Sequence, residues 1–313
     1  MRRQTPKEDM EEASQYHLPV LLQEVIDNMA IRPDGTYVDA TFGGGGHSRA
    51  ILSKLGESGR LLVFDQDEDA YRNRIEDNRV TFVQQNFRHL QRFLRLHKAG
   101  EVDGILADLG VSSYQFDTAE RGFSTRFEGN MDMRMDTRSP LTAAQILQTY
   151  SEPQLHLLFQ DYGEVTNART LAKTIVQQRK LHPLRTIGEF KSLIQPIVKG
   201  NPQKYLAQVF QALRIAVNDE LGALKDLLQQ SAQVLKPGGR LAIITFHSLE
   251  DRLVKNFMKT GSFEVQDPTY TFTTETPPKT FKLITKKPII AGAAELKVNS
   301  RSRSAKLRIA EKI

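Results

Sequence analysis

The residues whose types and spacing favour chemistry begin with four consecutive glycines, residues 43–46, followed by His47. A segment rich in β-branched and aromatic residues ends before them at Asp39, and a helix-compatible segment, 48–55, comes after. Because glycine has no Cβ, such a strand-to-helix turn lets a ligand lie against the backbone at the helix N-terminus. A plain tight turn is the alternative, although it does not require four glycines. We therefore predict a cofactor-binding turn.

The glycine run fits neither of two common phosphate-binding motifs. No Lys-Ser or Lys-Thr pair follows it, as a P-loop requires, and its glycines are adjacent instead of spaced as Gly-x-Gly-x-x-Gly. Asp65 ends the next strand-like segment, at roughly the twenty-residue spacing expected of a carboxylate that binds a ribose. A helix N-cap is the alternative role, which Asp67 or Asp69 could fill instead. The pattern predicts an adenosine-type cofactor.

Three acidic residues end predicted strands, namely Asp39, Asp65 and Asp108. Ligands in open α/β sheets bind beyond the carboxyl ends of the strands, so we expect these carboxylates to converge on one crevice. Such a crevice suits a cationic ligand, and S-adenosylmethionine carries a sulfonium and an amino group. Phe87, just past the third predicted strand, could stack on an adenine, although an isolated phenylalanine is more often a core residue.

Other polar motifs have plausible structural roles. The loop segments 121–124 and 132–136 could form a lid or hold a phosphate, or be ordinary charged loop. His247 and Ser248 lie side by side, but a hydrolase would need Gly-x-Ser-x-Gly, and Ser248 with Asp251 predicts a helix capping box. Four C-terminal basic residues could grip phosphates or form a solvated basic strand edge: Arg301, Arg303, Lys306 and Arg308.

The elements that must position these residues alternate between strand and helix at both ends of the chain. Predicted strands are 35–39, 60–65, 80–84, 102–108 and 240–246, and predicted helices between the first four are 48–55, 69–77 and 87–96. This alternation predicts a parallel sheet, with 282–285 and 305–310 as an antiparallel edge. A long loop, 114–135, precedes helical patterns at 167–181, 187–198 and 205–228, with capping boxes beginning at Ser151 and Thr186. An all-helical unit inserted into an α/β domain is the simplest description.

Composition narrows the function further. The 313 residues carry a net charge of +6, and the isoelectric point near 9.4 favours an anionic partner without proving one. There is no cysteine, which excludes disulfides, cysteine-ligated metals and a thiolate nucleophile. No apolar run approaches the roughly twenty residues of a membrane span, and the polar start predicts a flexible tail over 1–15. We expect a cytoplasmic protein without a membrane partner.

Taken together, several motifs resemble those of the bacterial ribosomal RNA small-subunit methyltransferase H family, over nearly the whole of 17–313. They occur in one order: 39–48 (DATFGGGGHS), 108–113 (DLGVSS), 120–124 (ERGFS), 132–136 (DMRMD), 246–252 (FHSLEDR) and the closing Arg-Ser run. The resemblance implies a class I (Rossmann-like) methyltransferase sheet with an inserted all-helical domain. It also implies S-adenosylmethionine as cofactor, and N4-methylation of one cytidine in the decoding region of 16S rRNA. The implied partner is 16S rRNA within the small ribosomal subunit.

The resemblance also assigns residues and domains. Its cofactor contacts fall on Gly45, Gly46, His47, Asp65, Phe87, Asp108 and Gln115. The implied methyltransferase domain is 16–113 and 218–313, and the insert is 114–217. No catalytic base and no metal ligand are assigned.

The absence of cysteine bears on the chemistry. Methylation of a pyrimidine at C5 ordinarily needs a thiolate, whereas attack by an exocyclic amine needs only alignment with the methyl group, at about 3–3.5 Å. Many amino-methyltransferases carry an Asp/Asn/Ser-Pro-Pro-aromatic motif where this chain has Asp108-Leu109-Gly110-Val111. We expect Asp108 to place the cofactor or accept a hydrogen bond from the amine. An NAD-dependent oxidoreductase, a hydrolase and a non-catalytic RNA-binding module are the competing classes.

Overall fold

The computed structural model describes residues 19–263 and 279–313, and the predicted tail over 1–15 lies outside them. The described chain divides into two compact units. The first unit comprises the described residues up to Asp65, then Asp69–Gly110 and Leu228–Ile313, and the second comprises Gln66–Glu68 and Val111–Leu227. The sequence placed the insert at 114–217.

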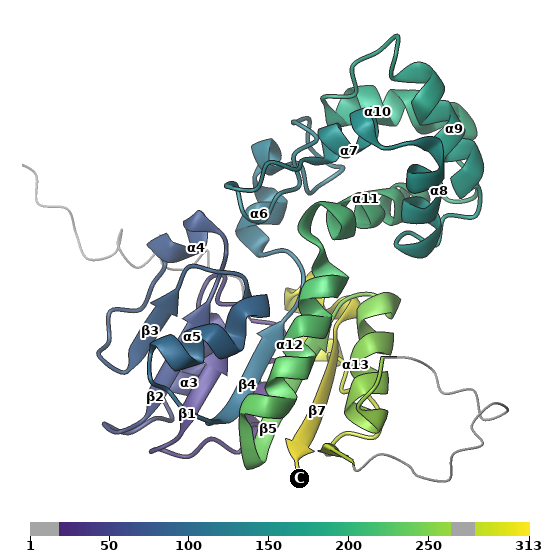
Figure 1. Ribbon diagram of the computed structural model, residues 1–313. Helices are drawn as coiled ribbons and strands as arrows, with labels where there is room; N and C mark the ends of the chain where they lie inside the picture. The colour runs from purple at the N-terminus through teal and green to yellow at the C-terminus, as the bar shows by residue number, and fades with distance from the viewer. Residues whose placement is uncertain (1–18, 264–278) are drawn as a thin grey trace, which may run out of the picture. The chain divides into compact units, whose positions relative to one another are not determined.

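A seven-stranded sheet forms the centre of the first unit (Figure 1), with strand order β3-β2-β1-β4-β5-β7-β6. Its strands are β1 (Thr36–Asp39), β2 (Arg60–Phe64), β3 (Val80–Val83), β4 (Val102–Asp108), β5 (Leu235–Thr245), β6 (Phe281–Leu283) and β7 (Lys306–Lys312). The first five are parallel, and β7 pairs antiparallel with both β5 and β6. This order, with the antiparallel edge expected from the sequence, confirms the class I (Rossmann-like) methyltransferase fold.

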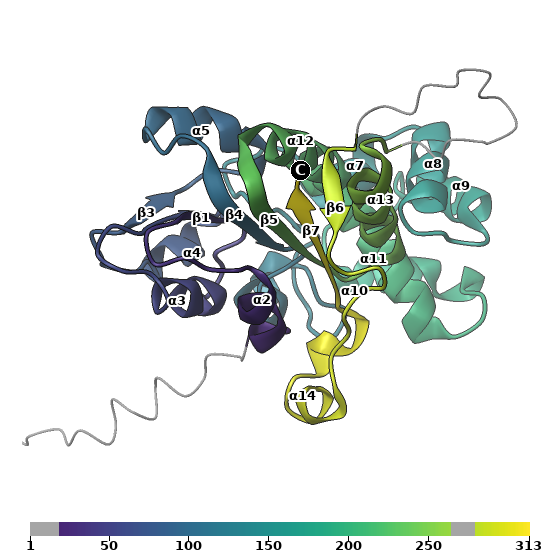
Figure 2. The same cartoon turned by 90° about the horizontal axis from the view of Figure 1, so that it is seen from below.

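Helices cover both faces of this sheet. They are α2 (Leu22–Asn28), α3 (Gly46–Leu52), α4 (Glu68–Arg72), η2 (Phe87–His89), α5 (Leu90–Leu96), α13 (Ser248–Thr260), α14 (Ala293–Val298) and η5 (Ser300–Ser304). Figure 2 shows α2 and α3 on one face and α5 on the other. The strands carry continuous apolar runs because both faces are covered: Leu61, Leu62, Val63 and Phe64 of β2 are all fully buried.

The second unit is built from helices around its own apolar core. They are α6 (Ser113–Asp117), η3 (Ala119–Arg121), α7 (Ala143–Thr149), α8 (Glu152–Asp161), α9 (Ala168–Gln178), α10 (Ile187–Ile194), η4 (Gln195–Ile197), α11 (Pro202–Asn218) and the start of α12 (Glu220–Val234). The predicted capping boxes at Ser151 and Thr186 are both present. One isolated bridge, Asn130 to Thr186, interrupts the helical pattern.

The predicted helix 205–228 is two helices. Asp219 adopts a left-handed conformation (φ 46°), which ends α11, and Arg214 pairs with Glu220 at 2.8 Å across the break. Strand β5 begins earlier than the predicted 240–246, since it includes residues 236–239, where Gly238 has a left-handed φ of 80°. Its pairing register with β4 shifts between Val102 and Gly104, and the extra residues are absorbed at this irregularity.

Candidate functional site

The carboxyl ends of the central strands place the three predicted acidic residues along one edge of the sheet. Asp39 ends β1 and lies in register with Val63 of β2 and Leu106 of β4. Asp65 directly follows β2, and Asp108 ends β4. Ligands of open α/β sheets bind beyond this edge, and the strand topology agrees with a crevice predicted there.

Asp39 itself does not present its carboxylate to a ligand. The side chain is 1% exposed, Ser48 Oγ donates to Oδ2 at 2.6 Å, and the Thr41 N–H donates to Oδ1 at 3.0 Å. Burial raises the pKa of Asp39, against the effect of these hydrogen bonds. The expectation that all three carboxylates face the ligand is therefore wrong for Asp39, which instead ties the start of α3 to β1.

The glycine turn joins β1 to α3, and its glycines have different reasons to be glycine. Gly43 and Gly45 have left-handed φ angles of 51° and 75°. The Gly43 N–H donates to Asp65 Oδ2 at 2.8 Å, which fastens the turn to the end of β2. A Cβ at Gly46 would collide with Pro19 Cγ. Glycine is therefore favoured in this run by the left-handed backbone at Gly43 and Gly45 and by close packing at Gly46, besides any room left for a ligand.

His47 is a buried member of the first turn of α3. Its Nε2 lies 3.0 Å from the Val20 carbonyl oxygen. Because a carbonyl oxygen only accepts hydrogen bonds, we assign the proton of the neutral ring to Nε2. Its Nδ1 lies 3.8 Å from Asp108 Oδ2. Burial lowers the pKa of His47, against the opposing effect of the Asp39 charge. A neutral imidazole is therefore in place beside Asp108.

Asp108 is the acidic group best placed to meet a cationic ligand. Its backbone N–H donates to Thr41 Oγ1 at 2.6 Å, and its side chain is 23% exposed. Oδ1 has no hydrogen-bond partner within residues 19–263 and 279–313. Burial raises the pKa of Asp108 well above its ordinary value, and the charges of Asp39 and Glu250 raise it further.

Two other predicted residues lie on the same unit. Asp65 is partly buried and holds the glycine turn, as described above. Phe87 is partly buried too and opens η2, whose N-cap Asn86 accepts the Arg88 N–H. Both positions follow the carboxyl ends of neighbouring strands, β2 and β3.

Gln115 lies in the second unit. It completes a capping box with Ser112 at the start of α6, and its Nε2 donates to Asp67. Arg121 also pairs with Asp67, at 2.8 Å. The structure therefore brings Gln115 to Asp67, the residue directly before α4. This hydrogen-bond partner was not predicted from the sequence.

Sequence reasoning missed Glu250 as a neighbour of the site. Glu250 is 2% exposed, and its Oε2 accepts the Phe246 N–H at 2.9 Å. His247 is the N-cap of α13 and forms the capping box with Glu250, so the predicted Ser248–Asp251 box is wrong. The spacing His-x-x-Glu directly after a buried strand was the available signal. Glu250 matters because its charge acts on Asp108.

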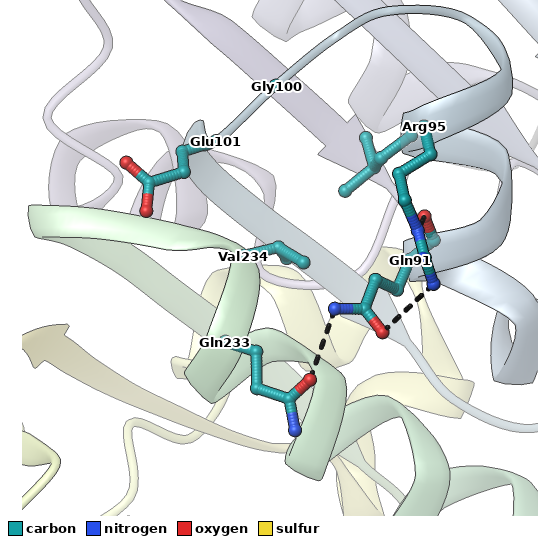
Figure 3. A pocket seen from close by; sticks show the side chains of 7 residues that line it. Gln91, Arg95, Gly100, Glu101, Gln233 and Val234 are labelled. Carbon is teal, nitrogen blue, oxygen red and sulfur yellow. Dashed lines mark hydrogen bonds between the residues drawn. The ribbon is translucent and has the colours of Figure 1, made fainter.

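A separate small pocket lies at the other edge of the sheet (Figure 3). It has a volume of about 280 Å³ and is lined by residues of α5, α12 and the segment before β4, among them Gln91, Arg95, Glu101 and Gln233. Gln91 donates to Gln233 at 3.2 Å and accepts from Arg95 at 3.4 Å. Because these side chains bond to one another at the amino end of β4, the pocket is not part of the predicted crevice.

Comparison with known proteins gives the chain a family. The MraW methylase family matches residues 14–313. Ribosomal RNA small subunit methyltransferase H of Bacteroides thetaiotaomicron is 58% identical over 299 residues, which cover 95% of this chain and 97% of that protein. The protein of the same name from Flavobacterium johnsoniae is 51% identical, over 96% of this chain and 98% of its own.

These matches extend over nearly the full length of this chain and of each relative. The strand order of the sheet is that of a class I methyltransferase. No helix in the described part of the chain has the length and apolar character to cross a membrane. The chain belongs to the MraW methylase family, and its methyl donor is S-adenosylmethionine.

Proposed function

We propose that this chain transfers a methyl group from S-adenosylmethionine to N4 of one cytidine in the decoding region of small-subunit (16S) ribosomal RNA. Family membership and full-length relatives named ribosomal RNA small subunit methyltransferase H support the RNA substrate. The nucleoside, the atom and the decoding region follow from the motif resemblance. We place the protein in the cytoplasm because its proposed substrate is the small ribosomal subunit.

The observation that carries the proposal is the position of Asp108 beside the glycine turn. Its Oδ1 is buried and has no hydrogen-bond partner in the described chain. An unpaired buried carboxylate is costly, so a ligand that supplies a positive charge or a donor group relieves this cost. The donor's amino and sulfonium groups supply the charge, and the target amine supplies hydrogen-bond donors.

The motif resemblance implies further donor contacts, and we include them in the proposal. Gly45, Gly46 and His47 would lie against the donor at the N-terminus of α3, and Asp65 would accept the ribose hydroxyls. Phe87 would stack near the adenine. Gln115, bonded to Asp67 in the second unit, is assigned by the resemblance alone.

When bound, the donor supplies an electrophilic methyl group on sulfur. The chain's part is to hold the amine in line with that group and to keep water out. Asp108 accepts a hydrogen bond from the amine, which fixes its orientation. Burial and the charges of Asp39 and Glu250 raise the pKa of Asp108, and the His47 ring lies 3.8 Å from it. The target base must leave its stack to reach this edge.

Methyl transfer followed by nucleoside analysis tests the proposal. The purified protein is incubated with isotope-labelled S-adenosylmethionine and small subunits from cells that lack the enzyme, and the digested RNA is analysed by mass spectrometry. We expect label on N4-methylcytidine at one decoding-region position. Label on another atom, or RNA without label, would reject the proposed function.

A further inference from the structure

The positive charge of the chain is concentrated near its C-terminus. Residues 279–313 hold ten Lys and Arg residues and only two acidic residues, whereas the whole chain has a net charge of +6. The segment therefore carries more positive charge than the whole chain, and the remainder is slightly acidic. Such an imbalance indicates a surface for an anionic partner.

Several of these cations are already occupied. Arg308 Nε lies 2.6 Å from Asp251 Oδ1, and Lys306 Nζ lies 3.2 Å from Asp251 Oδ2. Lys282 is 3.8 Å from Glu311. Arg308 and Lys306, two of the four residues that the sequence offered as phosphate contacts, thus have a structural carboxylate instead.

Four exposed cations of this segment define what we call the C-terminal basic surface: Lys286, Lys287, Lys297 and Arg303. Within the ranges 19–263 and 279–313 no carboxylate lies within ion-pair distance of any of them. The acidic residues of this segment do not neutralise the surface. Glu295 accepts the Leu21 N–H at 3.0 Å, and Glu311 pairs with Arg240 at 2.8 Å.

Pairing of the strands places this surface at the edge of the sheet that carries Asp108. Lys306, the first residue of β7, lies in register with Thr245, the last residue of β5. Arg303 in η5 comes just before it, so it lies near the carboxyl edge. Lys286 and Lys287 precede Ile289, which bridges to Leu307 at the same end of β7.

The other arm of the surface reaches the cofactor turn. Lys297 lies on α14, and Glu295 of the same helix bonds to Leu21 at the start of α2. The neighbouring Val20 carbonyl accepts from His47. Two hydrogen bonds, at Leu21 and Val20, thus link α14, which carries Lys297, to His47 beside the glycine turn.

We propose that the C-terminal basic surface binds the phosphate backbone of the RNA that flanks the target nucleotide. Its four cations lie on the edge where the base must enter, and unpaired exposed Lys and Arg side chains fit phosphates through charge and hydrogen bonds. The inference rests on the proposed function, since that function supplies the RNA. The proposal adds the surface that holds the RNA. The phosphate contacts come from the loop after β6, from α14 and from η5, and not from Lys306 and Arg308 of β7.

The test compares two sets of substitutions in the full-length chain. The surface variant is Lys286→Gln, Lys287→Gln, Lys297→Gln and Arg303→Gln, and the control variant is Lys54→Gln, Arg92→Gln and Lys98→Gln, three exposed cations toward the amino edge of the strands. Binding to small subunits that lack the mark is measured by filter retention at several salt concentrations. Donor affinity is measured by titration calorimetry.

We expect the surface variant to bind small subunits at least about tenfold more weakly, with a salt dependence lower by about one contact per removed cation. Donor affinity should stay unchanged, and KM for subunits should rise more than kcat falls. Replacing the three lysines by arginine should restore binding, which distinguishes lost charge from misfolding. The control variant should bind like wild type.

Three outcomes would overturn the inference while leaving the proposed function intact: wild-type binding by the surface variant, equal loss in the control variant, or no recovery with arginine. Label on a different atom with the wild-type enzyme would reject the proposed function instead. In that case the salt dependence of the surface variant still decides whether these four cations hold RNA.

Discussion

At the scale of single residues, the site depends on how Asp108 is charged. The sequence analysis grouped Asp39 with Asp108, but the Asp39 carboxylate accepts hydrogen bonds from Ser48 and Thr41. Asp108 keeps a buried oxygen that no described residue satisfies. The two carboxylates therefore differ in role because of their partners, although each ends a parallel strand. Their difference cannot be derived from strand position alone.

The raised pKa of Asp108 predicts a pH-dependent donor affinity. Below its pKa the carboxyl is neutral and attracts the cationic donor weakly, and above it the carboxylate pairs with the donor. Affinity should therefore rise with pH and level off once Asp108 is ionised. Titration calorimetry between pH 5 and about 9 should show this rise in the wild type.

Asp108→Asn is the matched control for that measurement. It keeps the shape of the side chain but removes its charge, so affinity should fall by roughly tenfold to a hundredfold at high pH, as for loss of a charged hydrogen bond. The rise with pH should disappear. An unchanged pH profile in this variant would assign the titration to another group.

At the scale of elements, the antiparallel edge strand is held to α13 by a nearly buried ion pair. Asp251 and Arg308 side chains are 14% and 9% exposed, and Lys306 joins them. Burial acts to raise the pKa of Asp251, but Arg308 and Lys306 together bring it below its ordinary value. The pair contributes stability above the unfolded-state pKa, and this contribution is lost as pH falls through the lower folded pKa.

Asp251→Asn should destabilise the first unit because it leaves the Arg308 guanidinium buried without its carboxylate. We expect a loss of about 3–5 kcal/mol, the range measured when one partner of a buried pair is removed. Urea unfolding followed by circular dichroism measures it. Asp117→Asn removes a pair with 62% and 45% exposed side chains and should change stability by less than about 1 kcal/mol. Equal losses would contradict a structural role for Asp251.

The elements themselves were largely predictable, and the exceptions are local. Continuous apolar runs such as Leu61, Leu62 and Val63 predict a buried parallel strand because both faces need covering. The break at Asp219 was missed because apolar periodicity continues through it, while a single left-handed residue ends the helix. The α13 capping box was assigned to Ser248 because serine is the more common cap, although His247 holds that position. The sequence suggested that Gly46 lacks a side chain to leave room for a ligand. The structure adds a second reason, because a Cβ there would collide with Pro19, twenty-seven residues earlier.

At the scale of the whole molecule, two segments far apart in the sequence meet beside the cofactor turn. Leu21 has a left-handed φ of 53°, a conformation costly for a side chain of this kind, and its N–H bonds to Glu295, 274 residues away. Its neighbour Val20 holds His47. Long-range contacts of this kind leave no trace in local sequence patterns, so neither partner was predicted.

Glu295→Ala should therefore weaken donor binding without touching the donor. The Leu21 N–H loses its acceptor, which releases the segment that holds His47 and packs on Gly46. We expect a lower melting temperature and an affinity for S-adenosylmethionine reduced by several-fold, measured by differential scanning fluorimetry with and without donor. Glu57→Ala, at an exposed position of the loop before β2, should behave like wild type.

The same bond between Leu21 and Glu295 orders events during synthesis. Translation makes Leu21 274 residues before Glu295, so a nascent chain carries the glycine turn before the carboxylate that fixes the segment in front of it. The acceptor of the Leu21 N–H is therefore absent until residue 295 has been added to the chain.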